Sequence, residues 1–245
     1  MLTADERLAL IRSKIERAKK HILDLEIARD RFIETEPYVI EPERDPQTGN
    51  HLFRVAKLQL PPPDLGLMAG DAAHNLRSAL DHLAYKLVLV NKETPNRNTG
   101  FPIFDDAARY VAGSHGKIKL MSQSAQDAIK ATEPYRGRNN LLWLINAIDI
   151  ADKHHTLLVG LIHVGRYSVR GPMFGRFNIP ESSPPLKEGD VIFSCEPKVY
   201  ENVKFTFDVT LKNPEAIAGV PLLPTLHKAA NRIDDLILSF KPLLV

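Results

Sequence analysis

The stretch from Gly70 to Leu83, with the sequence GDAAHNLRSALDHL, carries the side chains best suited to chemistry. At 100° per residue of an α-helix, its polar residues fall within about a third of the circumference. A face made only for water would usually carry lysine and glutamate, whereas short polar side chains hold hydrogen-bond geometry at some loss of helix propensity. The polar face therefore predicts a functional site. Its members are Asp71, His74, Asn75, Ser78, Asp81 and His82, with Arg77 at its edge.

A second segment, Asn139 to His154, supplies polar residues that could meet this face. It is apolar nearly all round, which predicts the central and most buried helix of the fold. Asn146, Asp149 and Lys153 nevertheless line one narrow side of it. A buried amide or carboxylate is costly unless it is paired. We therefore expect this polar side to contact the polar face of residues 71–82.

One chemistry that suits these residues is the cleavage of a phosphodiester. Arg77 and His82 are separated by four residues, and we expect them on neighbouring sides of one helix. A guanidinium group binds the non-bridging oxygens of a phosphate and stabilises developing charge. An imidazole moves a proton to or from a ribose hydroxyl. Asp149 and Lys153 would support this pair from the second helix.

The spacing from Arg77 to His82, on a helix within a helical bundle, resembles the signature of HEPN-domain ribonucleases. This resemblance covers residues 1–155 at most. It implies an endoribonuclease that acts without metal or cofactor, in a toxin or phage-defence setting, as a homodimer that brings two motifs together on RNA. It also implies that Arg77 and His82 are catalytic, supported by Asn75, Ser78 and Asp81. The segments HNLRSALDHL, FPIF and DKHH are similar to those of an uncharacterised family common in actinobacteria.

Two other interpretations of the polar residues remain open. Inward-facing carboxylates and imidazoles are typical of metal sites in helical bundles and would suit zinc, iron or manganese. The residues for such a site are Asp71, His74, Asp81, His82, Asp152 and His155, with Asp149 and His154 nearby. Alternatively, the polar faces pair with each other only to fix the packing of the bundle. The protein would then be a non-catalytic binding or scaffold protein.

The elements around the site predict an α+β protein. Thr3 and Glu6 form a capping-box pattern at the start of a long helix. Apolar residues then recur in steps of three and four, from Leu8 to Phe32, which predicts a helix packed in a bundle and allows a seam between two subunits. Pro37 ends this helix, residues 38–60 predict a β-hairpin, and a helix over about 65–90 carries the polar face. Residues 105–138 predict short helices separated by the sequence AGSHGK.

After His155 the sequence becomes rich in short β-type segments. TLLVGLIHV, RYSVR, RFNI, VIFSCE and KFTFDVTL predict an antiparallel sheet of about four or five strands. A last amphipathic helix is expected from Pro221 to Phe240. The predicted organisation is thus a helical bundle with an inserted hairpin over residues 1–155, and a β-rich half closed by a helix over residues 156–245.

Composition limits the possible classes of protein. The chain has 32 basic and 30 acidic residues and a net charge of +2, which does not fit a strongly basic protein that coats nucleic acid. One cysteine, Cys195, excludes an intramolecular disulfide and predicts a buried thiol. We expect no secretory signal and no membrane partner, because the first residues lack an apolar region and no apolar run approaches about 18 residues. These features predict a cytoplasmic protein.

Overall fold

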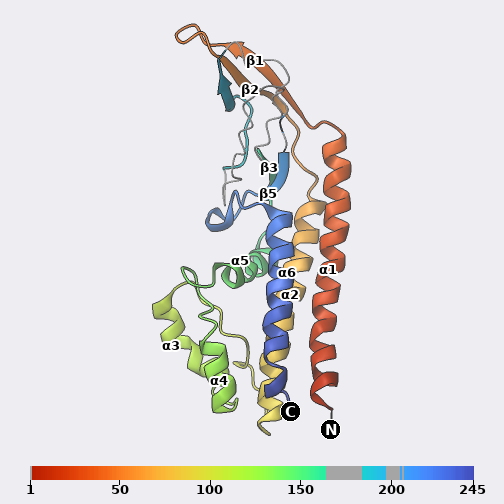
Figure 1. Cartoon of the computed structure of the whole chain (residues 1–245), viewed down its shortest axis with the longest axis vertical. Coiled ribbons are helices and arrows are strands. Elements are labelled where there is room, and N and C mark those ends of the chain that lie inside the picture. Colours follow the sequence, from red (N-terminus) through yellow and green to blue (C-terminus); the bar gives the residue numbers. More distant parts are fainter. Residues whose placement is uncertain (1, 164–183, 197–204, 206) are drawn as a thin grey trace. The chain divides into compact units, whose positions relative to one another are not determined.

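The computed structural model describes residues 2–163, 184–196, 205 and 207–245, and it confirms the predicted α+β class (Figure 1). Its helices are α1 (Ala4–Glu34), α2 (Asp64–Val90), α3 (Ala107–Ile118), α4 (Gln123–Lys130), α5 (Asn140–His154) and α6 (Leu222–Ser239). Its strands are β1 (Tyr38–Arg44), β2 (His51–Leu58), β3 (Val159–His163), β4 (Val191–Cys195) and β5 (Phe207–Leu211). None of the helices in these ranges is long and apolar enough to span a bilayer.

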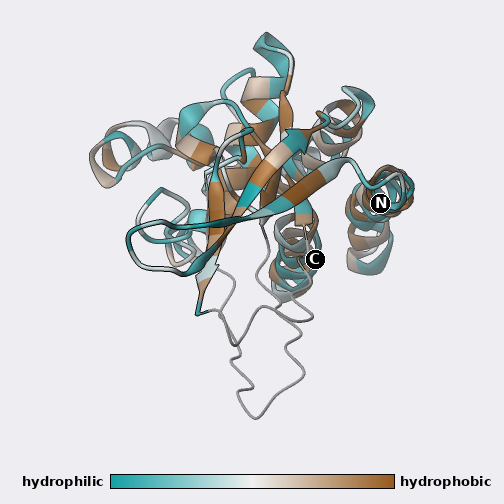
Figure 2. Ribbon diagram, turned by 90° about the horizontal axis from the view of Figure 1, so that it is seen from above, coloured by the Kyte–Doolittle hydropathy of each residue, from teal (hydrophilic) through white to brown (hydrophobic). Residues whose placement is uncertain are grey.

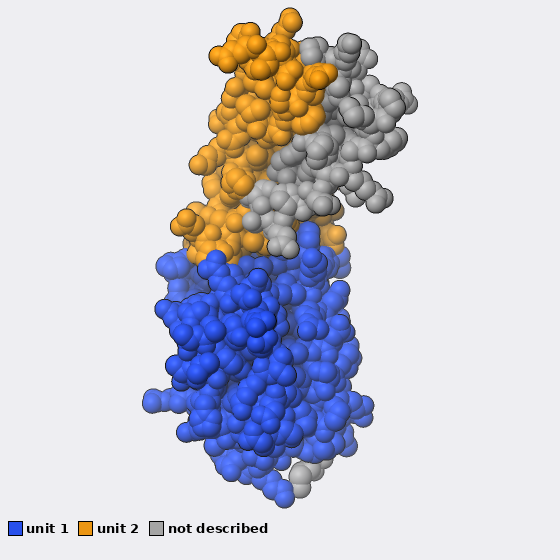
Figure 3. Space-filling view, turned by 60° about the vertical axis from the view of Figure 1, so that its left-hand side comes forward, with its two compact units in different colours: residues 1–24, 68–155, 224–245 blue, residues 25–67, 156–223 orange. Residues whose placement is uncertain are grey.

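The chain forms two compact units, each built from separate segments (Figure 3). The first unit comprises residues 1–24, 68–155 and 224–245, and the second comprises residues 25–67 and 156–223. The hairpin β1–β2 thus belongs with the later strands, whereas nearly all of α6 belongs with the earlier helices. We predicted two continuous parts, residues 1–155 and 156–245, whereas each observed unit combines segments from both. The chain does pass from one unit to the other between His155 and Thr156.

Helix α1 buries its apolar seam inside the chain. In the first unit Leu8, Ile11, Ile15, Ala18 and Ile22 are all at most 6% exposed. The predicted capping box is present, since the Thr3 amide donates to the Glu6 carboxylate and the Glu6 amide donates to the Thr3 hydroxyl. The seam therefore packs within the bundle, as predicted, and is not free to pair two subunits.

Helix α2, rather than α5, is the most buried helix of the first unit. Leu76, Leu80 and Leu83 are completely buried along α2, whereas Ile150 on α5 is half exposed. The prediction that α5 is the central helix was therefore wrong. The apolar residues on nearly all sides of α5 indicated full burial, but neighbouring elements cover several of them only in part. Hydrophilic and hydrophobic residues are interspersed along the helices in Figure 2, as expected for amphipathic helices.

The predicted break at AGSHGK does not occur, because α3 continues through these residues. Gly113 lies against the Phe104 ring, where an added Cβ would be 2.7 Å from two ring carbons. This glycine therefore serves close packing and does not end the helix. Helix α4 begins only after Ser122, whose hydroxyl accepts from the Ala125 amide as an N-cap.

Among its described residues, the second unit has two small antiparallel sheets, where we predicted a single sheet. One has the order β1–β2–β4, and the other pairs β3 with β5. Strand β4 thus adds to the predicted hairpin, and Cys195 at its end is buried. A partly buried ion pair, Arg29 with Asp208, joins α1 to β5 at 2.9 Å. The predicted segments RYSVR and RFNI lie outside the described residues.

Truncating the α2 core should destabilise the protein much more than truncating its surface. We expect Leu80→Ala to lower the free energy of unfolding by about 2–5 kcal/mol, because it removes a fully buried side chain and leaves a cavity. Leu89→Ala, on the same helix but 43% exposed, is the matched control and should cost under about 1 kcal/mol. Urea denaturation measures both, and equal effects would contradict this placement of α2.

Candidate active site

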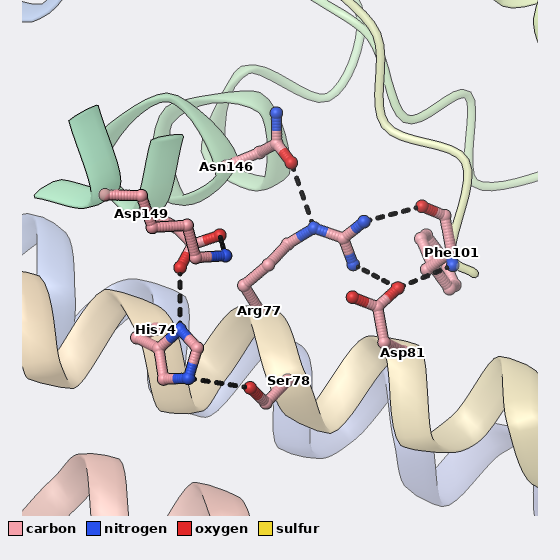
Figure 4. Close-up of polar contacts among 8 residues, drawn as sticks. His74, Arg77, Ser78, Asp81, Phe101, Asn146 and Asp149 are labelled. Carbon is pink, nitrogen blue, oxygen red and sulfur yellow. Dashed lines mark hydrogen bonds and ion pairs between the residues drawn. The ribbon is translucent and has the colours of Figure 1, made fainter. Parts of the chain in front are cut away.

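Helices α2 and α5 meet through polar side chains (Figure 4). Arg77 Nε donates to Asn146 Oδ1 at 2.9 Å, and His74 Nδ1 lies 2.9 Å from Asp149 Oδ1. The polar side of residues 146–153 therefore contacts the polar face of residues 71–82, as the sequence indicated. The contacts run in opposite chain directions, since the earlier α2 residue meets the later α5 residue.

The guanidinium group of Arg77 makes three contacts within the protein. Besides Asn146, it donates through Nη2 to the Phe101 carbonyl at 3.0 Å. Its Nη1 lies 2.7 Å from Asp81 Oδ1 as an ion pair, although that N–H is not directed at the oxygen as a hydrogen bond. The same carboxylate oxygen accepts from the Phe101 amide at 2.9 Å. With a side chain only 12% exposed, Arg77 binds α5 and the segment at Phe101 to α2.

His74 is an exposed imidazole oriented by a buried carboxylate. The Asp149 side chain is 4% exposed, whereas that of His74 is 48% exposed. Because a carboxylate only accepts, the contact places a proton on Nδ1 and leaves Nε2 as the basic nitrogen of the neutral ring. The Ser78 hydroxyl lies 3.5 Å from Nε2, and the ammonium group of Lys153 lies 2.6 Å from the second Asp149 oxygen.

His82 does not join Arg77 in this structure. Five helical residues rotate the chain by 500°, so the two side chains project about 140° apart, not from neighbouring sides as we predicted. His82 is exposed and lies near Lys14 of α1 and Lys86 of α2. Partial burial lowers the pKa of His82 below its ordinary value of 6.5, the two ammonium groups lower it further, and Asp81 opposes them.

The remaining predicted residues lie around His74 without forming a metal site. Asn75 is buried and donates to the Asp71 carbonyl one turn earlier, which assigns it a structural role. The Asp71 carboxylate is exposed and lies 3.9 Å from Nδ1 of His21. Across the ranges that the structure describes, no three His, Cys, Asp or Glu side chains are grouped to hold a metal ion. The six residues of the metal interpretation therefore do not converge.

Asp152 is the titratable residue of α5 that lies over Gly70. An added Cβ at Gly70 would overlap the Asp152 carboxyl group, so this close approach requires glycine. Partial burial raises the pKa of Asp152 above its ordinary value of 3.8. The negative charges of Asp71 and Asp149 raise it further, while His74 and Lys153 act in the opposite direction.

Sequence reasoning missed the main-chain groups of Phe101, which hold Arg77 and Asp81 in place. The segment FPIF is apolar in sequence, and Phe101 and Ile103 are buried. Its apolar side chains gave no sign that the backbone of the same segment would complete the polar contacts. Gly70 and the lysines near His82 also carried no signal that pointed to a site.

In comparisons with models of protein families, with curated proteins and with solved structures, nothing matches this chain. The function must therefore be inferred from the geometry of its residues.

Replacing Arg77 should lower the free energy of unfolding much more than replacing an exposed arginine. We expect Arg77→Ala to lower the free energy of unfolding by about 2–4 kcal/mol, because it leaves the Asn146 amide and the Phe101 carbonyl without their charged donor. Arg138→Ala removes an exposed pair with Glu133 at 3.7 Å and should cost under about 1 kcal/mol. Thermal or urea denaturation of both variants measures the difference, and a neutral Arg77→Ala would refute this role.

Proposed function

We propose that this protein is an endoribonuclease that acts without a metal ion, with His74 as its acid–base residue. The observation that carries the proposal is the contact between the exposed imidazole of His74 and the buried carboxylate of Asp149, at 2.9 Å. Such a carboxylate selects one imidazole tautomer and stabilises the imidazolium that forms when the ring accepts a proton. A histidine with only a packing role would not need a side chain that is half exposed.

The proposed reaction is transphosphorylation of RNA. His74 Nε2 accepts the proton of a ribose 2′-hydroxyl, and the 2′-oxygen attacks the adjacent phosphorus. The bond from phosphorus to the 5′-oxygen then breaks and this oxygen takes up a proton from an acid or from water, which gives a 2′,3′-cyclic phosphate and a free 5′-hydroxyl. Lys153 pairs with Asp149 and places positive charge beside His74, in a site that otherwise carries several carboxylates.

The structure supports a role for Arg77 different from the phosphate binding expected at the sequence level. Its donors already contact Asn146 and Phe101, and it pairs with Asp81. Arg77 acts in this proposal as a positioning residue that fixes α5 and thereby holds Asp149 against His74. Its replacement would reduce activity together with stability.

Replacement of His74 should abolish cleavage without unfolding the protein. We expect His74→Gln to lower the rate of cleavage of a labelled structured RNA by about 10²–10⁴-fold, the usual contribution of an acid–base residue. The glutamine amide can still donate to Asp149, so thermal stability should change little. Cleavage by the wild-type protein should persist in EDTA.

His115→Gln serves as the control, because His115 is exposed on α3 and should leave the rate unchanged. Equal cleavage by wild type and His74→Gln would refute the proposal. Cleavage that EDTA abolishes would favour the metal-binding alternative.

We also propose that the protein acts as a homodimer through the exposed face of α2, since the α1 seam is buried within the chain. Asp71, His74, Ser78, His82 and Tyr85 lie within about 80° of the helix circumference. Their spacing is symmetric about Ser78, with the histidines four residues away and the outer pair seven residues away. A twofold axis through Ser78 would therefore place each His74 opposite the partner's His82.

A charge at the outer edge of this face should prevent self-association. Tyr85 is 49% exposed, and we expect Tyr85→Glu to convert a dimer into a monomer because it would meet Asp71 of the second copy. Light scattering coupled to size-exclusion chromatography measures the mass. Val111→Glu, at an exposed position on α3, should leave the dimer intact. A wild-type monomer at high concentration would refute the proposed dimer.

The contacts of Arg77 favour a second candidate function, that of a non-catalytic binding or scaffold protein. In that case the polar contacts between α2 and α5 serve only to fix the packing of the bundle. The two candidates differ in the activity of the wild type. A structural role predicts no RNA cleavage, whereas the enzyme cleaves RNA and loses that activity in His74→Gln.

A further inference from the structure

Asp152 is the α5 carboxyl group that contacts α2 without a side-chain partner. Along the same side of α5, Asn146 contacts Arg77 and Asp149 contacts His74. One turn after Asp149, the carboxyl group of Asp152 lies over Gly70, which has no side chain to donate a hydrogen bond. Within the described ranges, we find no hydrogen bond or ion pair to the Asp152 carboxyl group. It is therefore a partly exposed carboxyl group with open hydrogen-bonding capacity beside the proposed site.

Partial burial raises the pKa of Asp152 and favours its protonated form, and nearby charges act in both directions. Asp71 of α2 and Asp149 of α5 act on it with negative charge, whereas His74 and Lys153 act with the opposite sign. His21 of α1 is a further titratable group near the site, because its Nδ1 lies 3.9 Å from the Asp71 carboxylate. Lys153 and His74 are both directed to Asp149, so neither pairs with Asp152. In such surroundings a carboxyl group is protonated more readily than an exposed one, and its proton can pass to a ligand.

We propose that Asp152 is the general acid of this site, which protonates the leaving 5′-oxygen while His74 accepts the proton of the 2′-hydroxyl. This inference rests on the proposed function. The proton of the Asp152 carboxyl group moves to the 5′-oxygen as the bond from phosphorus to that oxygen breaks. The products are the cyclic phosphate, the 5′-hydroxyl, an imidazolium at His74 and a carboxylate at Asp152. Proton exchange with water then restores both groups.

The positions of the two groups suit an in-line displacement. The attacking and leaving oxygens lie on opposite sides of phosphorus, so acid and base must act from separate positions. Gly70, over which Asp152 lies, precedes His74 by four residues on α2. Four residues of α-helix correspond to about 6 Å along the axis. One phosphodiester lying along α2 could therefore reach His74 with one oxygen and Asp152 with the other.

The leaving group of the substrate tests this assignment. A ribose 5′-oxygen needs a proton to leave, whereas 4-nitrophenolate leaves unprotonated. We expect Asp152→Asn to lower kcat/KM for a dinucleotide such as UpA by about 10²–10⁴-fold. The same variant should lower kcat/KM for uridine 3′-(4-nitrophenyl phosphate) less than about tenfold. His74→Gln should impair both substrates, and Asp127→Asn, a change on the exposed side of α4, should impair neither.

The outcomes separate this inference from the function on which it rests. If the wild type cleaves neither substrate, the proposed function is wrong, and the general-acid role is wrong with it. If Asp152→Asn impairs both substrates equally, the nuclease stands and the role of Asp152 is refuted. If His82→Asn shows the selective loss instead, His82 is the acid and this inference is again overturned.

A measurement on the wild type alone makes the test independent of the folding of any variant. Its cleavage of UpA should fall at high pH as Asp152 loses its proton, because the acid form is then depleted. Cleavage of the nitrophenyl ester should show no such fall, since that leaving group needs no proton. Identical high-pH behaviour with both substrates would refute the proposal.

Discussion

The contacts of one guanidinium group hold together the polar contact between α2 and α5. Arg77 lies on α2, the most buried helix, and joins it to two other segments. It binds Asn146 of α5 and the main chain at Phe101, and it pairs with Asp81 of α2 itself. A rigid guanidinium fork suits this role because its donors point in fixed directions. By holding α5 at Asn146, Arg77 fixes the part of that helix from which Asp149 and Asp152 project.

The buried Asp149 carboxylate then determines the properties of His74. A carboxylate with 4% exposure is tolerated only when its charge is balanced, and here an imidazole and an ammonium group contact its two oxygens. Both partners are themselves half exposed, so the stabilising charges lie at the protein surface. The arrangement places a defined imidazole tautomer where a ligand can reach it. It also leaves Asp152 as a neighbouring carboxyl group without such compensation.

Much of the fold could be predicted from local sequence patterns. The capping box at Thr3, the period of α1, the hairpin over 38–60 and the limits of α2 depend on interactions between residues close in the chain. The predictions that were wrong depend on distant contacts. AGSHGK stays helical because Gly113 packs against Phe104, and α5 is only partly covered because α2 occupies the centre of the bundle.

The sequence by itself determined which residues form the polar faces of α2 and α5 and that these faces need each other, because burial of unpaired polar groups is costly. Only the tertiary structure decided which residues pair. It directed Arg77 into the protein and left His82 outside, since their 140° separation on α2 places one against α5 and the other near α1. It also selected His74, because the crossing of α5 over Gly70 determines which α2 side chain meets Asp149. Helical spacing fixes the direction of a side chain, but packing between helices decides what that side chain meets.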